Sequence, residues 1–335
     1  MSKRNKKIVC LGGGTGVSVV LSGLKEYPVN LAAVVTMFDS GGSSGKLREE
    51  LEISPLGDIR QCLLTLSKKN DISQFFHYRF EKGSLRGHNL GNLLIAGAIK
   101  MTGGLETAMD EIERILKIKG KIFPVTLENA DIKAILNNNE KINGEENIVN
   151  CPYLSKLGIK KIFLEPKVKA NPKAIFAIKN SDLIIISPGK FYTSITPIFL
   201  VQGIPEAIRE SRAKKVFICN LRTQTGNTDC FGVEDFVKIL EEYLGKGSID
   251  YVIFNIGKLS PRSVKEVEKV FPNSDFIKYD KALLKKQNFI GVDVLDRNIR
   301  KLNPADVLVK GANKRTMVLH DSNKLAEVIM NLCKR

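Results

Sequence analysis

Residues 8–21 read Ile-Val-Cys-Leu-Gly-Gly-Gly-Thr-Gly-Val-Ser-Val-Val-Leu, an apolar run that ends in a glycine cluster and is followed by a second apolar run. This order predicts a buried strand, a tight turn and a helix. Glycines let backbone N–H groups approach an anion, and the N-terminus of the next helix adds positive charge at the same place. The expected phosphate-binding positions in this turn are Gly12, Gly13, Gly14, Thr15 and Gly16.

The spacing of these glycines differs from the dinucleotide-binding fingerprint Gly-x-Gly-x-x-Gly. Counted from Gly12, the third glycine of that fingerprint falls on Val17. We therefore interpret residues 12–16 as a variant phosphate-binding turn.

A second apolar segment, residues 31–38, is also predicted as a strand that ends in a glycine-rich turn. Asp39 begins this turn at roughly the ~20-residue offset at which an acidic residue meets ribose hydroxyls in dinucleotide-binding folds. A Walker A loop is excluded because it needs Gly at position 40 and Ser or Thr at position 47, where this chain has Ser40 and Leu47. The alternative is a pair of plain surface turns, but two such turns after adjacent strands favour a nucleotide-type ligand. The expected phosphate contacts are Gly41, Gly42, Ser43, Ser44 and Gly45, with Asp39 on the hydroxyls.

The composition is that of an ordinary globular chain of 335 residues with 43% hydrophobic content, enough for a large core. The formal net charge of +16 is spread along the whole sequence, so we expect only weak, salt-labile contacts with nucleic acid and no specific complex. An RNA-binding protein that uses this charge is kept as an alternative function class.

The six cysteines are widely separated and form no Cys-x-x-Cys pair, which indicates a reducing compartment and no structural zinc. The basic N-terminus lacks the features of a signal peptide, because glycines interrupt the apolar run. No apolar run reaches the ~20 residues that a membrane helix needs. We expect a cytoplasmic protein without membrane contact.

Strands and helices alternate along most of the chain, which predicts one α/β domain over residues 1–335. The expected fold is Rossmann-like, a mostly parallel sheet with helices on both faces. Residues 121–166 differ in pattern: they alternate apolar and polar positions and contain asparagine-rich turns. They are predicted to form a small β-rich insertion.

Three polar side chains cluster at the start of the apolar helix expected after residue 89. Asn89 is a candidate N-cap, while His88, Asn89 and Asn92 together also suit the sugar or substrate side of a ligand site. For His88 the structural and the ligand-binding interpretations have equal weight. Asp58 is predicted chiefly as the cap of a helix from residue 59, with a place in the cleft as the alternative.

The loop after the buried strand 183–186 leaves the sheet at a carboxyl end, where open α/β sheets bind ligands. Lys190 is a candidate for pairing with phosphate, and Thr193 is a candidate helix cap. The expected ligand-side positions of this loop are Gly189, Lys190, Tyr192 and Thr193.

Four motifs in this order resemble the gluconeogenesis-factor (YvcK-like) family, bacterial relatives of the 2-phospho-L-lactate transferase CofD. They are residues 12–16, residues 39–48, Gly57-Asp58-Ile59-Arg60 and Gly87-His88-Asn89-Leu90-Gly91-Asn92. The resemblance extends over nearly the whole chain.

The resemblance implies a CofD-like fold, a nucleotide-sugar ligand such as UDP-N-acetylglucosamine, and a regulatory role in central carbon metabolism, cell shape and envelope-precursor supply. It also implies an enzyme of amino-sugar synthesis as a partner, and we expect a homo-oligomer. No catalytic residue, metal ligand or fixed cofactor is assigned, although magnesium accompanies the transferase relatives. The alternative function is a CofD-like transferase that moves a phospholactyl-type group from a nucleotide-linked donor.

Overall fold

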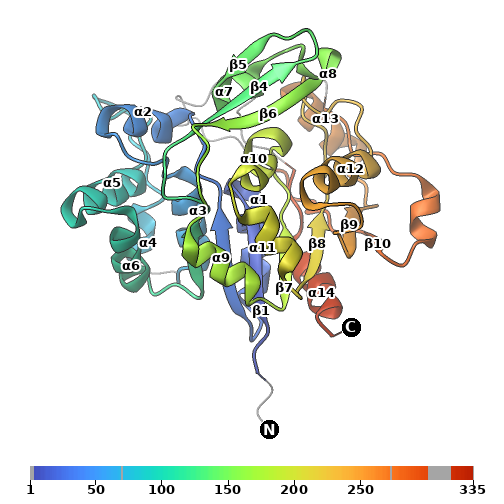
Figure 1. The fold of residues 1–335 in the computed structure, drawn as a ribbon, viewed down its shortest axis with the longest axis horizontal. Helices are drawn as coiled ribbons and strands as arrows, with labels where there is room; N and C mark the ends of the chain where they lie inside the picture. The colour runs from blue at the N-terminus through green and yellow to red at the C-terminus, as the bar shows by residue number, and fades with distance from the viewer. Residues whose placement is uncertain (1–3, 69–70, 272–273, 301–317, 335) are drawn as a thin grey trace.

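The structure is a computed structural model and describes residues 4–68, 71–271, 274–300 and 318–334. Its centre is a seven-stranded sheet in the order β10-β9-β8-β7-β1-β2-β3, in which all neighbouring strands pair in parallel (Figure 1). The strands are β1 (Lys7–Gly12), β2 (Asn30–Val35), β3 (Lys121–Pro124), β7 (Leu183–Ile186), β8 (Lys214–Ile218), β9 (Tyr251–Asn255) and β10 (Phe289–Val292).

Strand β1 lies inside the sheet and is buried from Ile8 onward, as a strand covered on both faces must be. Ile8 faces Leu31 of β2 on one side and Leu183 of β7 on the other. The chain thus builds the sheet outward from β1 through β2 and β3, then returns and builds the other half from β7. The strand order reverses between β1 and β7, which is where folds of this kind place their ligands.

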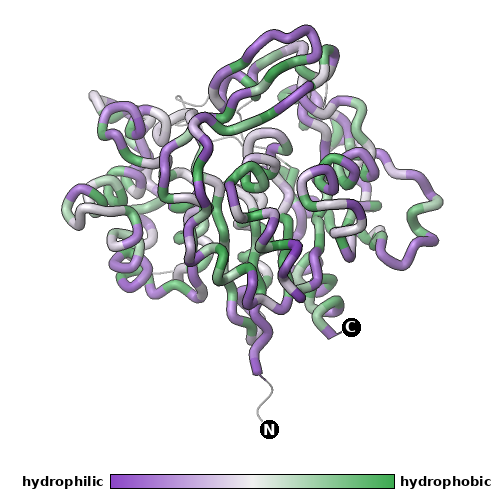
Figure 2. The backbone as a smooth tube through the Cα atoms, in the orientation of Figure 1, coloured by the Kyte–Doolittle hydropathy of each residue, from purple (hydrophilic) through white to green (hydrophobic). Residues whose placement is uncertain are grey.

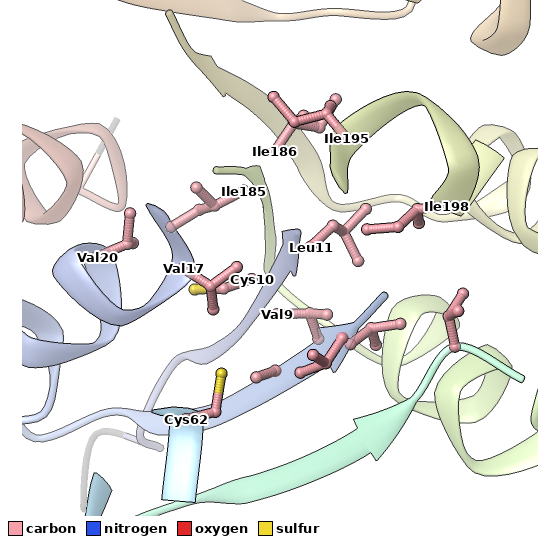
Figure 3. Close-up of a cluster of buried hydrophobic side chains, with 14 of the residues drawn as sticks. Val9, Cys10, Leu11, Val17, Val20, Cys62, Ile185, Ile186, Ile195 and Ile198 are labelled. Carbon is pink, nitrogen blue, oxygen red and sulfur yellow. The ribbon is translucent and has the colours of Figure 1, made fainter. Parts of the chain in front are cut away.

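Helices cover both faces of the sheet. One group contains α1 (Gly14–Leu24), α3 (Gly57–Leu66) and α14 (Ser322–Leu332), which contact one another through α1. A second group contains α9 (Pro172–Lys179), α10 (Thr196–Leu200), α11 (Ile204–Glu210) and α12 (Val233–Leu244). Figure 3 shows that Val17 and Val20 of α1 approach the sheet from one side and Ile198 of α10 from the other.

The remaining helices surround these layers. They are α2 (Gly42–Leu51), α4 (Asp71–Phe75), α5 (Leu90–Thr102), α6 (Leu105–Leu116), α7 (Glu145–Asn150), α8 (Leu154–Leu157), the π-helix η1 (Phe191–Ile195), α13 (Pro261–Val270) and the 3-10 helix η2 (Lys281–Lys285). Figure 2 shows hydrophobic segments concentrated along the central strands, while hydrophilic ones lie on the periphery.

A separate antiparallel sheet of three strands, in the order β5-β4-β6, lies at the top of the molecule in Figure 1. Its strands are β4 (Asp131–Leu136), β5 (Lys141–Asn143) and β6 (Ile159–Glu165). The predicted insertion 121–166 is therefore too long, because residues 121–124 form the edge strand β3 of the main sheet. Ile132, Ala134 and Leu136 turn inward from β4 and join the main core, so this small sheet is packed onto the rest of the molecule.

The predicted fold class is confirmed: the main sheet is parallel, and helices lie on both of its faces. Strand β7 has the bounds that the apolar pattern indicates. The N-cap of α5 is Asn89, whose side chain accepts a hydrogen bond from the backbone N–H of Asn92 at 3.2 Å.

Candidate functional site

A cleft of about 640 Å³ lies where strands β1, β2, β7 and β8 end. The loops that follow these four strands supply most of its lining, and α13 and residues 318–320 close one end. Its volume falls in the range of about 300–1,000 Å³ that small-molecule sites occupy. Its position at the reversal of strand order is the one that ligand crevices take in open α/β sheets.

The first glycine turn forms one wall of this cleft. A Cβ at Gly16 would lie 1.6 Å from the carbonyl oxygen of Pro188, so glycine is needed there for α1 to approach the loop after β7. Gly12 ends β1 below the wall, at φ +150°, where a Cβ would press on Val17 at 2.7 Å. The residues of this turn that line the cleft are Gly13, Gly14, Thr15 and Gly16.

The second glycine turn forms the adjacent wall. The Asp39 carboxylate accepts a hydrogen bond from the backbone N–H of Gly41 at 3.1 Å, which fixes the turn. Gly45 does not face the cleft in the described structure; a Cβ there would meet the Ser40 carbonyl oxygen at 2.1 Å. The residues that line the cleft are Asp39, Gly41, Gly42, Ser43 and Ser44.

The helix after this turn begins earlier than the sequence indicates. The sequence analysis places residues 41–45 in a turn, but Gly41 is the N-cap and residues 42–45 form the first turn of α2. The sequence does not indicate this helix start, because the glycines and serines there have low helix propensity. Gly42 has φ +58°, which glycine adopts without strain. Two helices, α1 and α2, therefore begin at the cleft, and each N-terminus offers unpaired N–H groups and a positive partial charge. Such ends are suited to holding the oxygens of an anion.

The polar side chains at the start of α5 contact Ser43 in the first turn of α2. Ser43 Oγ lies 3.3 Å from His88 Nδ1 and accepts a hydrogen bond from the Asn92 side-chain amide at 3.3 Å. The Asn92 side-chain oxygen accepts a hydrogen bond from Arg60 Nε at 2.8 Å. Asn92 reaches the cleft, whereas His88 and Asn89 are buried and do not line it in the described structure. Burial, with a smaller contribution from the charge of Lys46, lowers the pKa of His88, which favours the neutral ring.

The loop after β7 supplies one of the cationic side chains of the cleft, that of Lys190. Lys190 Nζ lies 3.0 Å from Glu145 Oε1, and Thr193 Oγ1 lies 3.5 Å from the same oxygen. The Asn220 side chain holds the loop by accepting from the Gly189 N–H at 3.0 Å and donating to the Gly189 carbonyl oxygen at 2.7 Å. Gly189, Lys190 and Thr193 line the cleft.

Tyr192 lies apart from the other residues of this loop. Its ring meets the edges of Phe191 and Phe231, at centroid distances of 5.2 and 6.4 Å, and it does not line the cleft in the described structure. The π-helical turn η1 sends neighbouring side chains in different directions, which the loop sequence does not reveal.

Two carboxyl groups of the cleft have raised pKa values. Burial, reinforced by the charge of Glu145, raises the pKa of Asp39 to about 6, although Lys190 opposes the shift. Burial and the charge of Asp39 raise the pKa of Asp58 to about 8. Asp58 is not the helix cap that we predicted: Leu56 is the N-cap of α3, and Asp58 lies in the first turn and faces Gly13 and the cleft.

Three further cleft residues carry little local sequence signal. Glu145 belongs to α7, which lies between strands β5 and β6 of the small sheet; we call residues 131–165 the small-sheet insertion. Asn220 follows β8. His320 lines the far end; its Nε2 lies 3.2 Å from the Cys219 carbonyl oxygen, and burial lowers its pKa to about 4. For Asp58, by contrast, the Gly57-Asp58-Ile59-Arg60 motif indicated a place in the cleft.

The carboxylates of the cleft do not form a ready metal centre. No group of three or more His, Cys, Asp or Glu side chains among the described residues has the geometry to hold a metal ion. Asp39 and Asp58 both line the cleft, and one or two carboxylates are enough to hold a magnesium ion that arrives with ligand phosphates. A magnesium ion thus fits this cleft only as the companion of a phosphorylated ligand.

Comparison with known proteins places the chain in context. Residues 8–299 match the family model of 2-phospho-L-lactate transferase CofD. The Gluconeogenesis factor of Bacillus subtilis is 38% identical over 334 residues, covering 98% of both chains. The Gluconeogenesis factor of Halalkalibacterium halodurans is 42% identical over 253 residues, covering 75% of this chain and 77% of that protein.

Solved structures agree with these sequence matches. A crystal structure of a Bacillus halodurans protein superposes with a TM-score of 0.85 at 35% identity, covering 98% of this chain and 100% of that one. A second crystal structure, described as a member of the UPF0052 family, gives the same TM-score at 34% identity and the same coverage. Within the described residues, every helix is too short or too polar to cross a membrane. The match over residues 8–299 and the 38% identity to a relative that is covered over 98% of its length together show that the chain belongs to the CofD family, in its group of gluconeogenesis factors.

Proposed function

We propose that the protein is a cytoplasmic regulator that binds a nucleotide sugar, with UDP as the nucleotide part, in the cleft between β1, β2 and β7. The observation that carries the proposal is the meeting of two helix N-termini, those of α1 and α2, with Lys190 at the reversal of strand order. Diphosphate oxygens accept hydrogen bonds from such N–H groups and are neutralised by their charge. Asp39 then accepts hydrogen bonds from ribose or sugar hydroxyls.

The regulatory part of the proposal is supported by the relatives named gluconeogenesis factors. Their similarity over three quarters or more of the chain favours a role in central carbon metabolism. Our proposal extends this role to the supply of envelope precursors and the maintenance of cell shape. In this role the protein reports the nucleotide sugar to a partner, for which an enzyme of amino-sugar synthesis is our candidate, and it acts as a homo-oligomer. The six free thiols agree with a reducing compartment.

A transferase is the second candidate, favoured by the match to the CofD model. Asp58, protonated near neutral pH beside Gly13 and Gly14, would be placed to donate a proton next to a transferred group. A regulator binds its ligand without turnover, whereas a transferase gives a product that depends on magnesium. Incubation with UDP-sugars and magnesium, followed by chromatography of the nucleotide, separates the two.

A thermal-shift screen tests the proposal as a whole. UDP-sugars at millimolar concentration are expected to raise the melting temperature, because a ligand that binds only the folded state stabilises it. ADP and GDP serve as controls for general phosphate binding. Equal shifts with all diphosphates would contradict the assignment of uridine, and no shift with any of them would contradict the nucleotide site.

Asp39→Asn is expected to lower the affinity for UDP-sugars about ten- to a hundredfold at pH 7.5. The substitution keeps the shape but removes a charged acceptor, and hydrogen bonds to a charged group are worth about 1.5–3 kcal/mol. Calorimetric titrations with ribose and 2′-deoxyribose forms of the ligand, with and without magnesium, provide the measurement.

The deoxy ligand is the matched control, because it lacks one of the hydroxyls that Asp39 would bind. If Asp39 instead serves magnesium, only the metal-dependent part of the affinity falls. Unchanged affinity under every condition would leave Asp39 with the turn-fixing bond to Gly41 as its sole role.

A further inference from the structure

Glu145 of α7 lines the cleft and is almost fully buried, with 3% of its surface exposed. Its position is fixed from two sides. Gly144 N–H donates to the Ile132 carbonyl oxygen at 2.8 Å, and Glu146 N–H donates to Ser40 Oγ at 3.2 Å. The carboxylate is therefore held between the loop after β2 and the turn η1, beside the glycine turns.

The two oxygens of this carboxylate differ in their surroundings. Oε1 lies 3.0 Å from Lys190 Nζ and 3.5 Å from Thr193 Oγ1, whereas Oε2 is buried and has no hydrogen-bond partner among the described residues. A buried acceptor on a charged group costs free energy when it has no donor, and such atoms in folded proteins normally have one. The last torsion of glutamate is broad, so a small rotation turns a carboxylate oxygen toward the cleft without loss of the lysine contact.

The donor that this oxygen lacks cannot come from a phosphate. Phosphate oxygens are acceptors, and they carry the same sign of charge as Glu145, so the two repel each other. A carboxylate accepts from neutral O–H and N–H groups, and Lys190 already supplies the nearby ammonium. A neutral donor placed just beyond the phosphates is what the sugar of a nucleotide sugar offers.

We propose that Glu145 accepts a hydrogen bond from a hydroxyl or amide N–H of the ligand's sugar, so that the small-sheet insertion determines which sugars the cleft selects. The assignment rests on the proposed nucleotide-sugar function. It identifies Glu145 as the residue that recognises the sugar and so distinguishes a nucleotide sugar from a bare nucleotide. Sites built to pair a ligand hydroxyl reject analogues that lack it, because the buried acceptor is then left without a partner.

The test compares UDP with UDP-glucose on wild type and Glu145→Gln by calorimetric titration. The variant keeps the shape of the side chain and removes its charge. The affinity for UDP-glucose is expected to fall by about ten- to a hundredfold, while the affinity for UDP stays the same or rises. Glu128→Gln, an exposed position outside the cleft, is the matched control and is expected to change neither affinity.

Glu145→Asp is the second variant, since it keeps the charge next to Lys190 and withdraws the carboxylate by one methylene. It is expected to show the same selective loss for UDP-glucose. An equal loss for UDP and UDP-glucose in both variants would overturn the assignment and leave Glu145 as a residue that positions Lys190. Unchanged affinity for UDP-glucose would also overturn it. If wild type binds UDP and not UDP-glucose, the assignment of Glu145 to a sugar contact is contradicted. If wild type binds neither ligand, the proposed nucleotide-sugar function is contradicted as well.

Discussion

Gly14→Val is expected to lower the affinity for a nucleotide sugar by at least about a hundredfold and to leave a folded protein. Gly14 is the first residue of α1 and lines the cleft, so a branched side chain would occupy the space in which a phosphate meets the helix N-terminus. A Cβ alone would lie 3.0 Å from an Asp58 carboxylate oxygen. Calorimetric titration of the folded variant with a UDP-sugar measures the loss.

The backbone at Gly14 has φ +52°, so valine also adds left-handed strain of about 1–2 kcal/mol. Gly83→Val is the matched control: Gly83 has φ +74°, nothing lies near the position of its missing Cβ, and it does not line the cleft. The control should lose similar stability and keep full affinity. Full affinity in Gly14→Val would show that the phosphates lie elsewhere.

Asp58→Asn is expected to stabilise the ligand-free protein, and the gain should grow as the pH rises from 5 to 8. The folded state holds a proton on Asp58 up to about pH 8, whereas an unfolded chain releases it near pH 4. Between these values the folded state binds more protons, so the free energy of unfolding of wild type falls as the pH rises. Asparagine does not ionise, so the free energy of unfolding of the variant does not fall for this reason as the pH rises.

The expected gain between pH 5 and pH 8 is about 2–4 kcal/mol, because each unit of pKa difference is worth about 1.4 kcal/mol and contact with the cleft's water reduces the full value. Urea unfolding of both proteins at several pH values provides the measurement. Asp110→Asn, at an exposed position of α6, controls for the loss of one negative charge. A gain that does not vary with pH would contradict the burial of an ionisable group at position 58.

Much of the fold was predictable from local pattern. Buried parallel strands are continuous apolar runs, and Leu183–Ile186 has no other plausible structure between two polar loops. The edge strand β3 was assigned to the wrong sheet because its alternating burial resembles that of β4, and strand pairing is not written in either segment. Phe75 and Tyr78 are aromatic and yet exposed, so aromatic character alone does not reveal burial.

The glycine turns of the cleft were also predictable, because positive φ and close approach leave glycine as the one suitable residue at positions such as Gly14 and Gly16. Glu145 was not predictable, because its place depends on how the small sheet docks over Ser40 and Thr193. For His88 a ligand contact and a structural role have equal weight in the sequence analysis, and in the structure its buried ring lies beside Ser43 Oγ.

The central claim is that the junction of α1, α2 and the loop after β7 binds the diphosphate of a nucleotide sugar. Calorimetric titration of the wild-type chain with UDP-N-acetylglucosamine tests it most directly. We predict saturable binding of one ligand per chain that competes with UDP and is lost in Gly14→Val. Absence of heat and of competition at millimolar ligand, with and without magnesium, would contradict the claim.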